Sequence, residues 1–171
     1  MAGLMTVRGR TLLAGGWLFV AALWCGMLAF FGAFGARTVL LTAPSRHAAG
    51  AVNRALLDGL DAVSLGTVVL LVSGLVFWNR ASAWSPRARG LALRLLAVAA
   101  VAAIASLYVI TPEMMALRDR MGAIDLVPKT DPLRQHWGRL HGLSSLTLLV
   151  RLLAGIGAFA AGFSQLSRGK D

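Results

Sequence analysis

Polar side chains that could do chemistry interrupt the last apolar stretch of the chain, RLHGLSSLTLLVRLLAGIG, residues 139–157. His141, Ser144 and Ser145 follow one another at three- and four-residue spacing, which places them on one face of a helix. Arg151 follows on the shoulder of that face, well inside the apolar run. A histidine and two hydroxyls could transfer protons, bind a ligand or hold helices together, and an intramembrane arginine requires a partner.

A second set of polar residues is expected to meet this face. Asp58 and Asp61 lie three residues apart in another apolar stretch, so both point to the same side of one helix. Because the two stretches start from the same side of the membrane, Arg151 could pair with Asp58 or Asp61, either as a structural clamp or as part of a functional site. The predicted polar cluster consists of His141, Ser144, Ser145, Arg151, Asp58, Asp61, His47, Arg46, Tyr108 and Glu113.

Few specific chemistries match this pattern. His47, His136 and His141 lack the short His-x-x-x-His or Cys-x-x-Cys spacing of many metal sites, so we predict no metal site. Haem needs an axial histidine in a helical pocket, and His141 is the candidate best placed for it, but we predict no cofactor. No phosphate-cradling glycine loop occurs and no catalytic residue is assigned. The sequence leaves enzymatic activity open and favours a protein that is not an enzyme.

The elements that must position these residues are four apolar segments, each near or above the roughly 20 residues that cross a bilayer as a helix. They cover about residues 11–41, 56–78, 91–110 and 140–165. Prolines in polar surroundings separate them, and Asp131 followed by Pro132 is typical of a helix start. Runs this long are unlike barrel strands. The sequence therefore predicts an all-α fold, an integral membrane four-helix bundle, as a single four-span domain over residues 1–171.

Composition agrees with a membrane protein. Of the 171 residues 57% are hydrophobic and 14% are charged, more apolar surface than a soluble fold of this length can bury. The formal net charge of +10 could suggest nucleic acid, but the basic residues fall between the apolar runs, as in membrane loops. We therefore expect the lipid bilayer as partner and no nucleic acid. Glycines in the first and fourth segments suggest close helix packing, compatible with a homo-oligomer or a subunit of a larger membrane complex.

The orientation of the protein in the membrane is predicted from a small difference in charge between its two sides. Lysines and arginines divide almost equally between the two sides of the predicted bundle, so the positive-inside rule gives nearly a tie. The acidic loop residues Asp119, Asp125 and Asp131 fall on the side away from the chain termini. This distribution favours termini on the cytoplasmic side of a multi-pass protein.

Several motifs carry a resemblance to a known family. They lie in the stretches WCGMLAFFGAFGARTVLLTAPSRHAAG, YVITPEMMALRDRM and DPLRQHWGRLHGLSSLTLL. The motif residues are Trp24 and Gly26; Pro44, Arg46 and His47; Pro112; and His141, Gly142, Ser144 and Ser145. This pattern resembles the transmembrane protein 205-like family, a domain of unknown function. The resemblance implies a four-span integral membrane protein whose third span ends at a proline, and it implies no reaction, cofactor or substrate.

The chain departs from that family at the level of Arg151. Leu148 and Leu149 stand where eukaryotic members carry an asparagine soon after the serines, and Arg151 itself is outside the pattern. The chain also lacks the first-span histidine of small four-helix haem proteins, which argues against bound haem. We therefore expect a non-enzymatic accessory subunit or a small-solute handling component with a polar cluster near one membrane face. The alternative is a membrane redox or metal- or haem-handling protein that uses His141 with His47 or His136.

Overall fold

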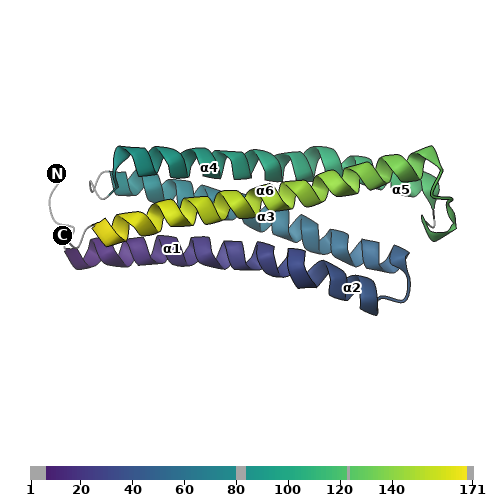
Figure 1. Ribbon diagram of the computed structural model, residues 1–171, viewed down its shortest axis with the longest axis horizontal. Coiled ribbons are helices and arrows are strands. Elements are labelled where there is room, and N and C mark those ends of the chain that lie inside the picture. Colours follow the sequence, from purple (N-terminus) through teal and green to yellow (C-terminus); the bar gives the residue numbers. More distant parts are fainter. Residues whose placement is uncertain (1–6, 80–83, 123, 169–171) are drawn as a thin grey trace.

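The computed structural model describes residues 7–79, 84–122 and 124–168 and arranges them as four antiparallel helical rods (Figure 1). The first rod contains α1 (Val7–Phe30), a π-helical turn η1 (Phe31–Gly35) and α2 (Ala36–Thr42). The second rod is α3 (Arg46–Asn79). The third contains α4 (Pro86–Ala105), a second π-helical turn η2 (Ser106–Ile110) and α5 (Thr111–Met121). A short 3-10 turn, η3 (Ile124–Leu126), precedes the fourth rod, α6 (Pro132–Arg168).

All four rods are long and apolar enough to cross a membrane, which confirms the all-α membrane bundle. The helices extend beyond the apolar segments seen in the sequence. The second rod starts at Arg46, about ten residues before its apolar segment, and the fourth starts at Pro132. These polar extensions lie at the bundle end opposite the start of α1 and the end of α6, which we call the far end (Figure 1).

Short polar residues start three of the rods. The Asp131 carboxylate accepts hydrogen bonds from the backbone N–H groups of Leu133 and Arg134, at 2.8 and 3.3 Å, so the predicted helix start is confirmed. Ser45 caps α3 by accepting from the Ala48 N–H at 3.0 Å, and Ser85 caps α4 from the position before a proline. These caps fix where each rod begins, and therefore which residues reach the far end.

The third span does not end at Pro112, contrary to the expectation from the family resemblance. Pro112 lies in the first turn of α5, and the rod continues to Met121. A proline inside a helix lacks an N–H and its ring crowds the carbonyl four residues earlier. The π-helical turn η2 directly before it provides a wider turn at that point, so the chain stays helical. Gly122, with φ of 66°, then ends α5 in a conformation that favours glycine.

The core lies along the contacts that α6 makes with α1 and α4, and α3 packs against α4 and α1. Glycines of α6 allow the closest approach: a Cβ at Gly155 would lie 2.7 Å from the Cys25 Sγ. In α1, by contrast, Gly15 and Gly26 have open space around them, so the packing role predicted for the first-span glycines is wrong at these positions. The largest fully buried apolar side chains are Leu28, Leu71, Leu75 and Leu96.

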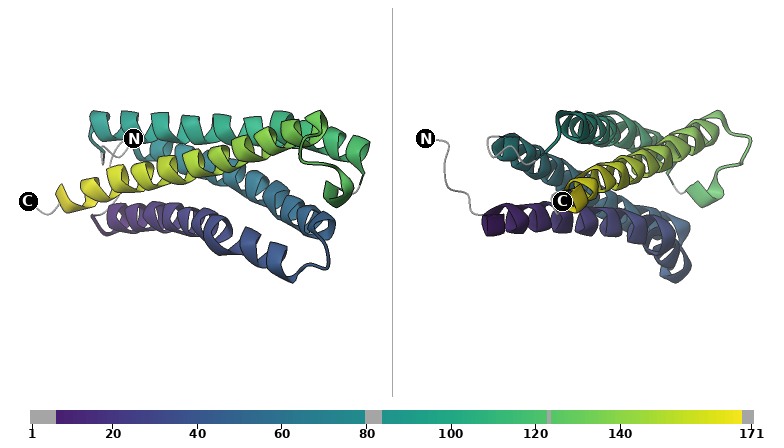
Figure 2. Two further views of the ribbon diagram at one scale, coloured as in Figure 1. Left: turned by 45° about the vertical axis from the view of Figure 1, so that its right-hand side comes forward. Right: turned by 60° about the vertical axis from the view of Figure 1, so that its left-hand side comes forward.

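The first rod bends at η1, and α2 diverges from the rest of the bundle toward the far end (Figure 2). A π-helical turn holds one residue more per turn than the flanking α-helix and commonly marks such a bend. Beyond the bend, α2 keeps its contacts with α3, and the Asn53 amide donates to the Ala36 carbonyl at 3.1 Å. The divergence separates α2 from α6 and leaves room between them.

Candidate functional site

A fully buried ion pair joins the second and fourth rods. The Arg151 Nη1 donates to Asp61 Oδ1, and both side chains are completely inaccessible to solvent. The Arg151 Nε also donates to the Thr147 carbonyl at 3.3 Å. Within the described part of the chain, the Arg151 Nη2 and the Asp61 Oδ2 have no hydrogen-bond partner. The pair therefore links α3 to α6 through a charge-assisted hydrogen bond, with one polar atom of each partner left over.

Asp58 does not share this pair. It accepts from the Arg54 Nε at 3.4 Å, one helical turn earlier on α3, and both side chains are about one-third exposed. A three-residue spacing rotates the second carboxylate by about 60° around the helix, which is enough to turn Asp61 into the core and Asp58 to its edge. Of the two partners that the sequence allowed for Arg151, the structure places Asp61 in contact.

Polar contacts continue past the pair along α3, as far as the Leu71 carbonyl, which accepts from the Trp17 Nε1 at 2.9 Å. The Trp24 Nε1 donates to the Ser64 Oγ at 3.0 Å, one turn further along α3, and both residues are buried. On α6, Thr147 lies one turn before Arg151 and Ser144 one turn before that, and both are buried. The buried polar residues thus form a column from the far end to the middle of the bundle, where the leucine core takes over.

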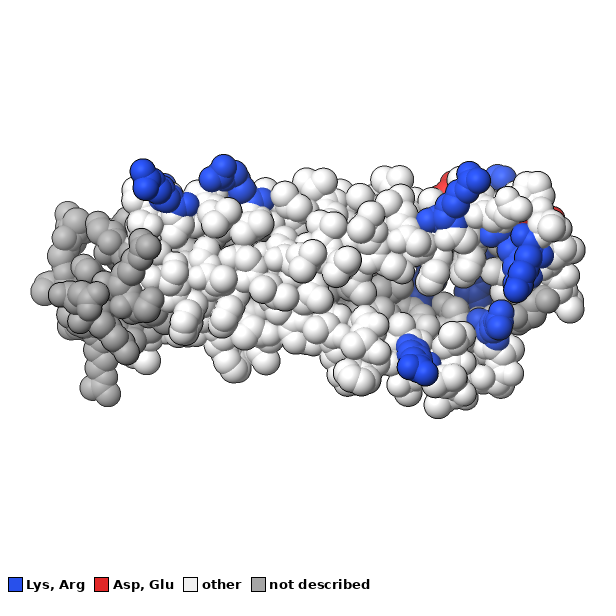
Figure 3. All heavy atoms as spheres, viewed as in Figure 1, with Lys and Arg blue, Asp and Glu red and all other residues white. Residues whose placement is uncertain are grey.

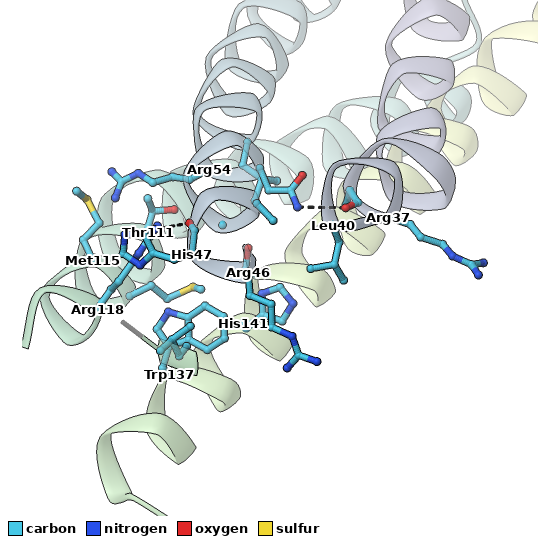
Figure 4. Close-up of a pocket in the computed structure, with 18 of the residues that line it drawn as sticks. Arg37, Leu40, Arg46, His47, Arg54, Thr111, Met115, Arg118, Trp137 and His141 are labelled. Carbon is cyan, nitrogen blue, oxygen red and sulfur yellow. Dashed lines mark hydrogen bonds between the residues drawn. The ribbon is translucent and has the colours of Figure 1, made fainter. Parts of the chain in front are cut away.

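A pocket of about 510 Å³ lies at the far end, directly beyond Ser144. Figure 4 shows Leu40 of α2 on one side, Met115 and Arg118 of α5 on the other, and Trp137 and His141 of α6 between them. Its walls are mainly apolar, and its size is that of sites for drug-sized ligands. The lining residues are Gly32, Ala36, Arg37, Leu40, Arg46, His47, Ala49, Gly50, Asn53, Arg54, Leu57, Thr111, Met114, Met115, Arg118, Ile124, Arg134, Trp137, His141 and Ser144.

The charged residues that the structure places in the pocket lining are all basic. Five arginines line the pocket and, among the described residues that do so, there is no aspartate or glutamate. Arg118 donates to the His47 carbonyl at 2.6 Å, and Arg134 donates to the Val127 carbonyl, so these two side chains are held by backbone oxygens. Arg54 shares its charge with Asp58. Figure 3 shows the arginines and lysines gathered around a hollow at this end, and a long uncharged band along the middle of the face in view.

His141 lies in this pocket rather than at the buried pair. Its ring stacks on the Trp137 ring at 5.3 Å between centroids and 3° between planes. Arg46 and His47 line the same pocket, and Ser144 closes its inner end. Ser145 turns away, is exposed and donates to the His141 carbonyl at 3.1 Å. Four residues of the predicted cluster therefore meet at the pocket, and two meet at the buried pair.

The remaining members of the predicted cluster lie elsewhere. Glu113 and His136 approach each other at 3.7 Å on the outside of the far end, with both side chains about half exposed. Tyr108 is 68% exposed on the outer surface of η2. The ten predicted residues thus do not form one cluster. Within the described ranges, no group of three His, Cys, Asp or Glu residues could hold a metal ion.

The sequence reasoning missed several residues that the structure brings to these two places. Thr147 and Ser64 flank the buried pair, and Asn53 and Trp137 line the pocket. Arg118, like Arg54 and Arg134, is not part of the predicted cluster, whereas Arg46 is. The signal was present in the sequence, because the five arginines of the pocket come from all four rods, in the parts that reach the far end.

Comparison with known proteins identifies a family that has no assigned activity. The family model described as "Domain of unknown function (DUF4149)" matches residues 19–123. This range includes Asp61 and the pocket residues of α2, α3 and α5, and it ends before α6. No curated protein and no solved structure matches the chain.

Proposed function

Because the chain belongs to the family of the domain of unknown function DUF4149, which carries no assigned activity, we propose its function from the pocket alone. The proposal is an integral membrane protein that binds a small anionic solute at the far end of its bundle. Binding, rather than a reaction on the solute, is the activity proposed. The observation that carries it is the set of five arginines around one pocket, in which the lining residues that the structure describes include no carboxylate.

Like charges brought together repel one another, and a bound anion removes that repulsion. Arginine is always charged and offers a planar set of N–H donors that matches carboxylate and phosphate oxygens. In the pocket, Arg118 and Arg134 are held in place by backbone carbonyls, so their remaining N–H groups are already oriented. Pre-oriented donors lose less entropy when a ligand arrives, which favours binding.

The finer family assignment is part of this proposal. We propose that the chain is a transmembrane protein 205-like protein, because several of the residues that carry the resemblance meet in space. Arg46, His47, His141 and Ser144 line the pocket, and Trp24 hydrogen-bonds in the buried polar column below it. Residues that are far apart in the sequence but line one site are expected to recur together in a family whose members share that site.

The test is thermal unfolding of the protein in dodecyl maltoside with inorganic phosphate or dodecyl phosphate added. We expect at least one of these anions to raise the midpoint, and the shift to shrink several-fold when Arg37 and Arg46 are both replaced by glutamine. Both side chains are exposed and belong to the pocket lining. Arg87→Gln with Arg94→Gln, two exposed arginines near the other end of the bundle, is the matched control. Equal shifts in both double variants, or no shift with either anion, would overturn the proposal.

A further inference from the structure

The pocket opens on the side of the bundle. The first rod bends at η1, so α2 and α6 separate toward the far end (Figures 1 and 2). In Figure 3 the hollow is visible in a view perpendicular to the long axis of the bundle, between the lobe formed by α2 and the rest of the far end. In a membrane protein the sides of the helices face lipid. A ligand can therefore reach the pocket laterally, from within the bilayer.

The pocket also changes character with depth. On α6 it runs from Arg134 to Ser144, ten residues or about 15 Å along the bundle axis. Three rods contribute a basic residue at the outer end: Arg46 on α3, Arg118 on α5 and Arg134 on α6. The other two arginines of the lining, Arg37 on α2 and Arg54 on α3, lie between these and the inner end.

The inner end has no charge. It is lined by Gly32 of η1, Leu57 of α3, Thr111 of α5 and Ser144 of α6. This inner part points toward the middle of the bundle, where the uncharged band of Figure 3 lies. The described lining of the pocket is thus most basic toward its outer end and uncharged at its inner end.

We propose, resting on the anion-binding function above, that the ligand is an anionic phospholipid that enters laterally between α2 and α6. Its phosphate lies among Arg46, Arg118 and Arg134, and the upper part of one acyl chain lies along Leu57 and the inner end. Basic pockets between transmembrane helices are suited to anionic lipid headgroups, because the guanidinium groups bind the phosphate oxygens. The rest of the lipid remains in the bilayer, so a pocket smaller than a whole lipid is sufficient.

The balance of forces favours a lipid over a soluble anion. A soluble phosphate gains nothing from the apolar walls and loses hydration on entering them. A lipid already lies at the level of the side opening. Its chain leaves one apolar environment for another at little cost, because lipid tails are as apolar as leucine side chains. The arginines then determine which lipid headgroup binds in the pocket.

Binding is measured by native mass spectrometry of the detergent-purified full chain with three probes. These are dioleoylphosphatidylglycerol, the zwitterionic dioleoylphosphatidylcholine with the same chains, and glycerophosphoglycerol, the same headgroup without chains. We expect phosphatidylglycerol to bind at least roughly ten-fold more tightly than either other probe, since one charge-assisted hydrogen bond corresponds to about that factor. The Arg46→Gln/Arg134→Gln variant, which removes two of the three arginines around the phosphate, loses most of this preference, and the Arg87→Gln/Arg94→Gln control keeps it.

A pocket-filling variant tests the inner end separately. Ala36→Phe places a ring in the pocket, whereas Ala33→Phe, three residues earlier on the exposed side of η1, does not. We expect the first to weaken phosphatidylglycerol binding several-fold and the second to leave it unchanged. If Ala36→Phe fails to fold, the three-probe comparison on the unaltered chain still decides.

The outcomes separate the two proposals. If the soluble headgroup binds as tightly as the lipid, the anion-binding proposal holds and the lipid proposal is wrong. If phosphatidylcholine binds as tightly as phosphatidylglycerol, anion recognition itself is wrong. If no probe binds, both proposals fail.

Discussion

Replacing Arg151 with leucine is expected to destabilise the bundle more than replacing any exposed charged residue with a neutral one. The substitution removes the only hydrogen bond that Asp61 makes within the described chain, leaving a carboxylate without a partner in the middle of the protein. Arg151 also loses its bond to the Thr147 carbonyl. Breaking one side of a buried ion pair costs about 3–5 kcal/mol of unfolding free energy, and most of this is the penalty of the stranded charge.

The double variant separates the contribution of the ion pair to the unfolding free energy from that of the packing around it. With Asp61→Leu and Arg151→Leu together, no charge is stranded, so we expect a loss of only about 1–2 kcal/mol. Simple addition of the two single losses would give about 6–10 kcal/mol. The coupling free energy between the two residues is therefore expected to exceed about 3 kcal/mol.

The assay is unfolding by sodium dodecyl sulfate in mixed micelles, followed by far-ultraviolet circular dichroism. The same cycle on Arg54 and Asp58 is the matched control, because that pair has the same chemistry at the partly exposed edge of α3. There we expect a coupling of about 0.3–0.5 kcal/mol. Additive losses at Asp61 and Arg151, or single losses below about 1 kcal/mol, would show that the pair does not hold the two rods together.

Further predictions follow from orientation, cofactor content, packing and assembly. With cytoplasmic termini, a green fluorescent protein fused to the C-terminus fluoresces and an alkaline phosphatase fused there stays inactive; the reverse pattern contradicts that orientation. The purified protein is expected to show no Soret band and no stoichiometric metal, since His141 stacks on Trp137, and one haem per chain would refute this. Gly155→Ala is expected to lose about 1–3 kcal/mol because its Cβ meets Cys25, whereas Gly142→Ala, with open space around it, gains about 0.4–1 kcal/mol. Equal effects at the two glycines would contradict the packing of α6. Mass measurement in mild detergent is expected to give more than one chain per particle, and a strictly monomeric mass would oppose a homo-oligomer.

The four rods could be predicted from the sequence because hydrophobic length is a strong signal in a chain that must cross a bilayer. Asp131 and Pro132 marked the start of α6 for an equally local reason, since a cap acts within one turn. The bounds toward the far end were less predictable. The stretch that extends α3 back to Arg46 mixes small apolar residues with Arg46, His47, Asn53 and Arg54, so it is not part of a continuous hydrophobic segment that would predict the helix.

The site was harder to predict because it depends on rotation and bending, which the sequence does not encode locally. Asp58 and Asp61 share one side of α3, yet a rotation of about 60° separates a buried ion pair from an edge contact. The pocket depends on the divergence of α2, which begins at a π-helical turn with the sequence FGAFG. Nothing in that sequence distinguishes it from the α-helix around it. The candidates His141, Ser144, His47 and Arg46 do meet at the pocket, whereas the sequence did not point to Trp137, Asn53 or Arg118 beside them.

The π-helical turn at Phe31–Gly35 has a consequence for how this family can change over time. Such a turn holds one residue more than an α-helical turn, so deleting a single codon there restores a continuous helix without altering the buried faces on either side. The protein would keep its core and its four rods, but α2 would straighten against α6 and close the side opening. Gain or loss of the pocket is thus one small genetic step away from a fold that is otherwise the same, and members that differ by one residue at this turn are expected to differ in what they bind.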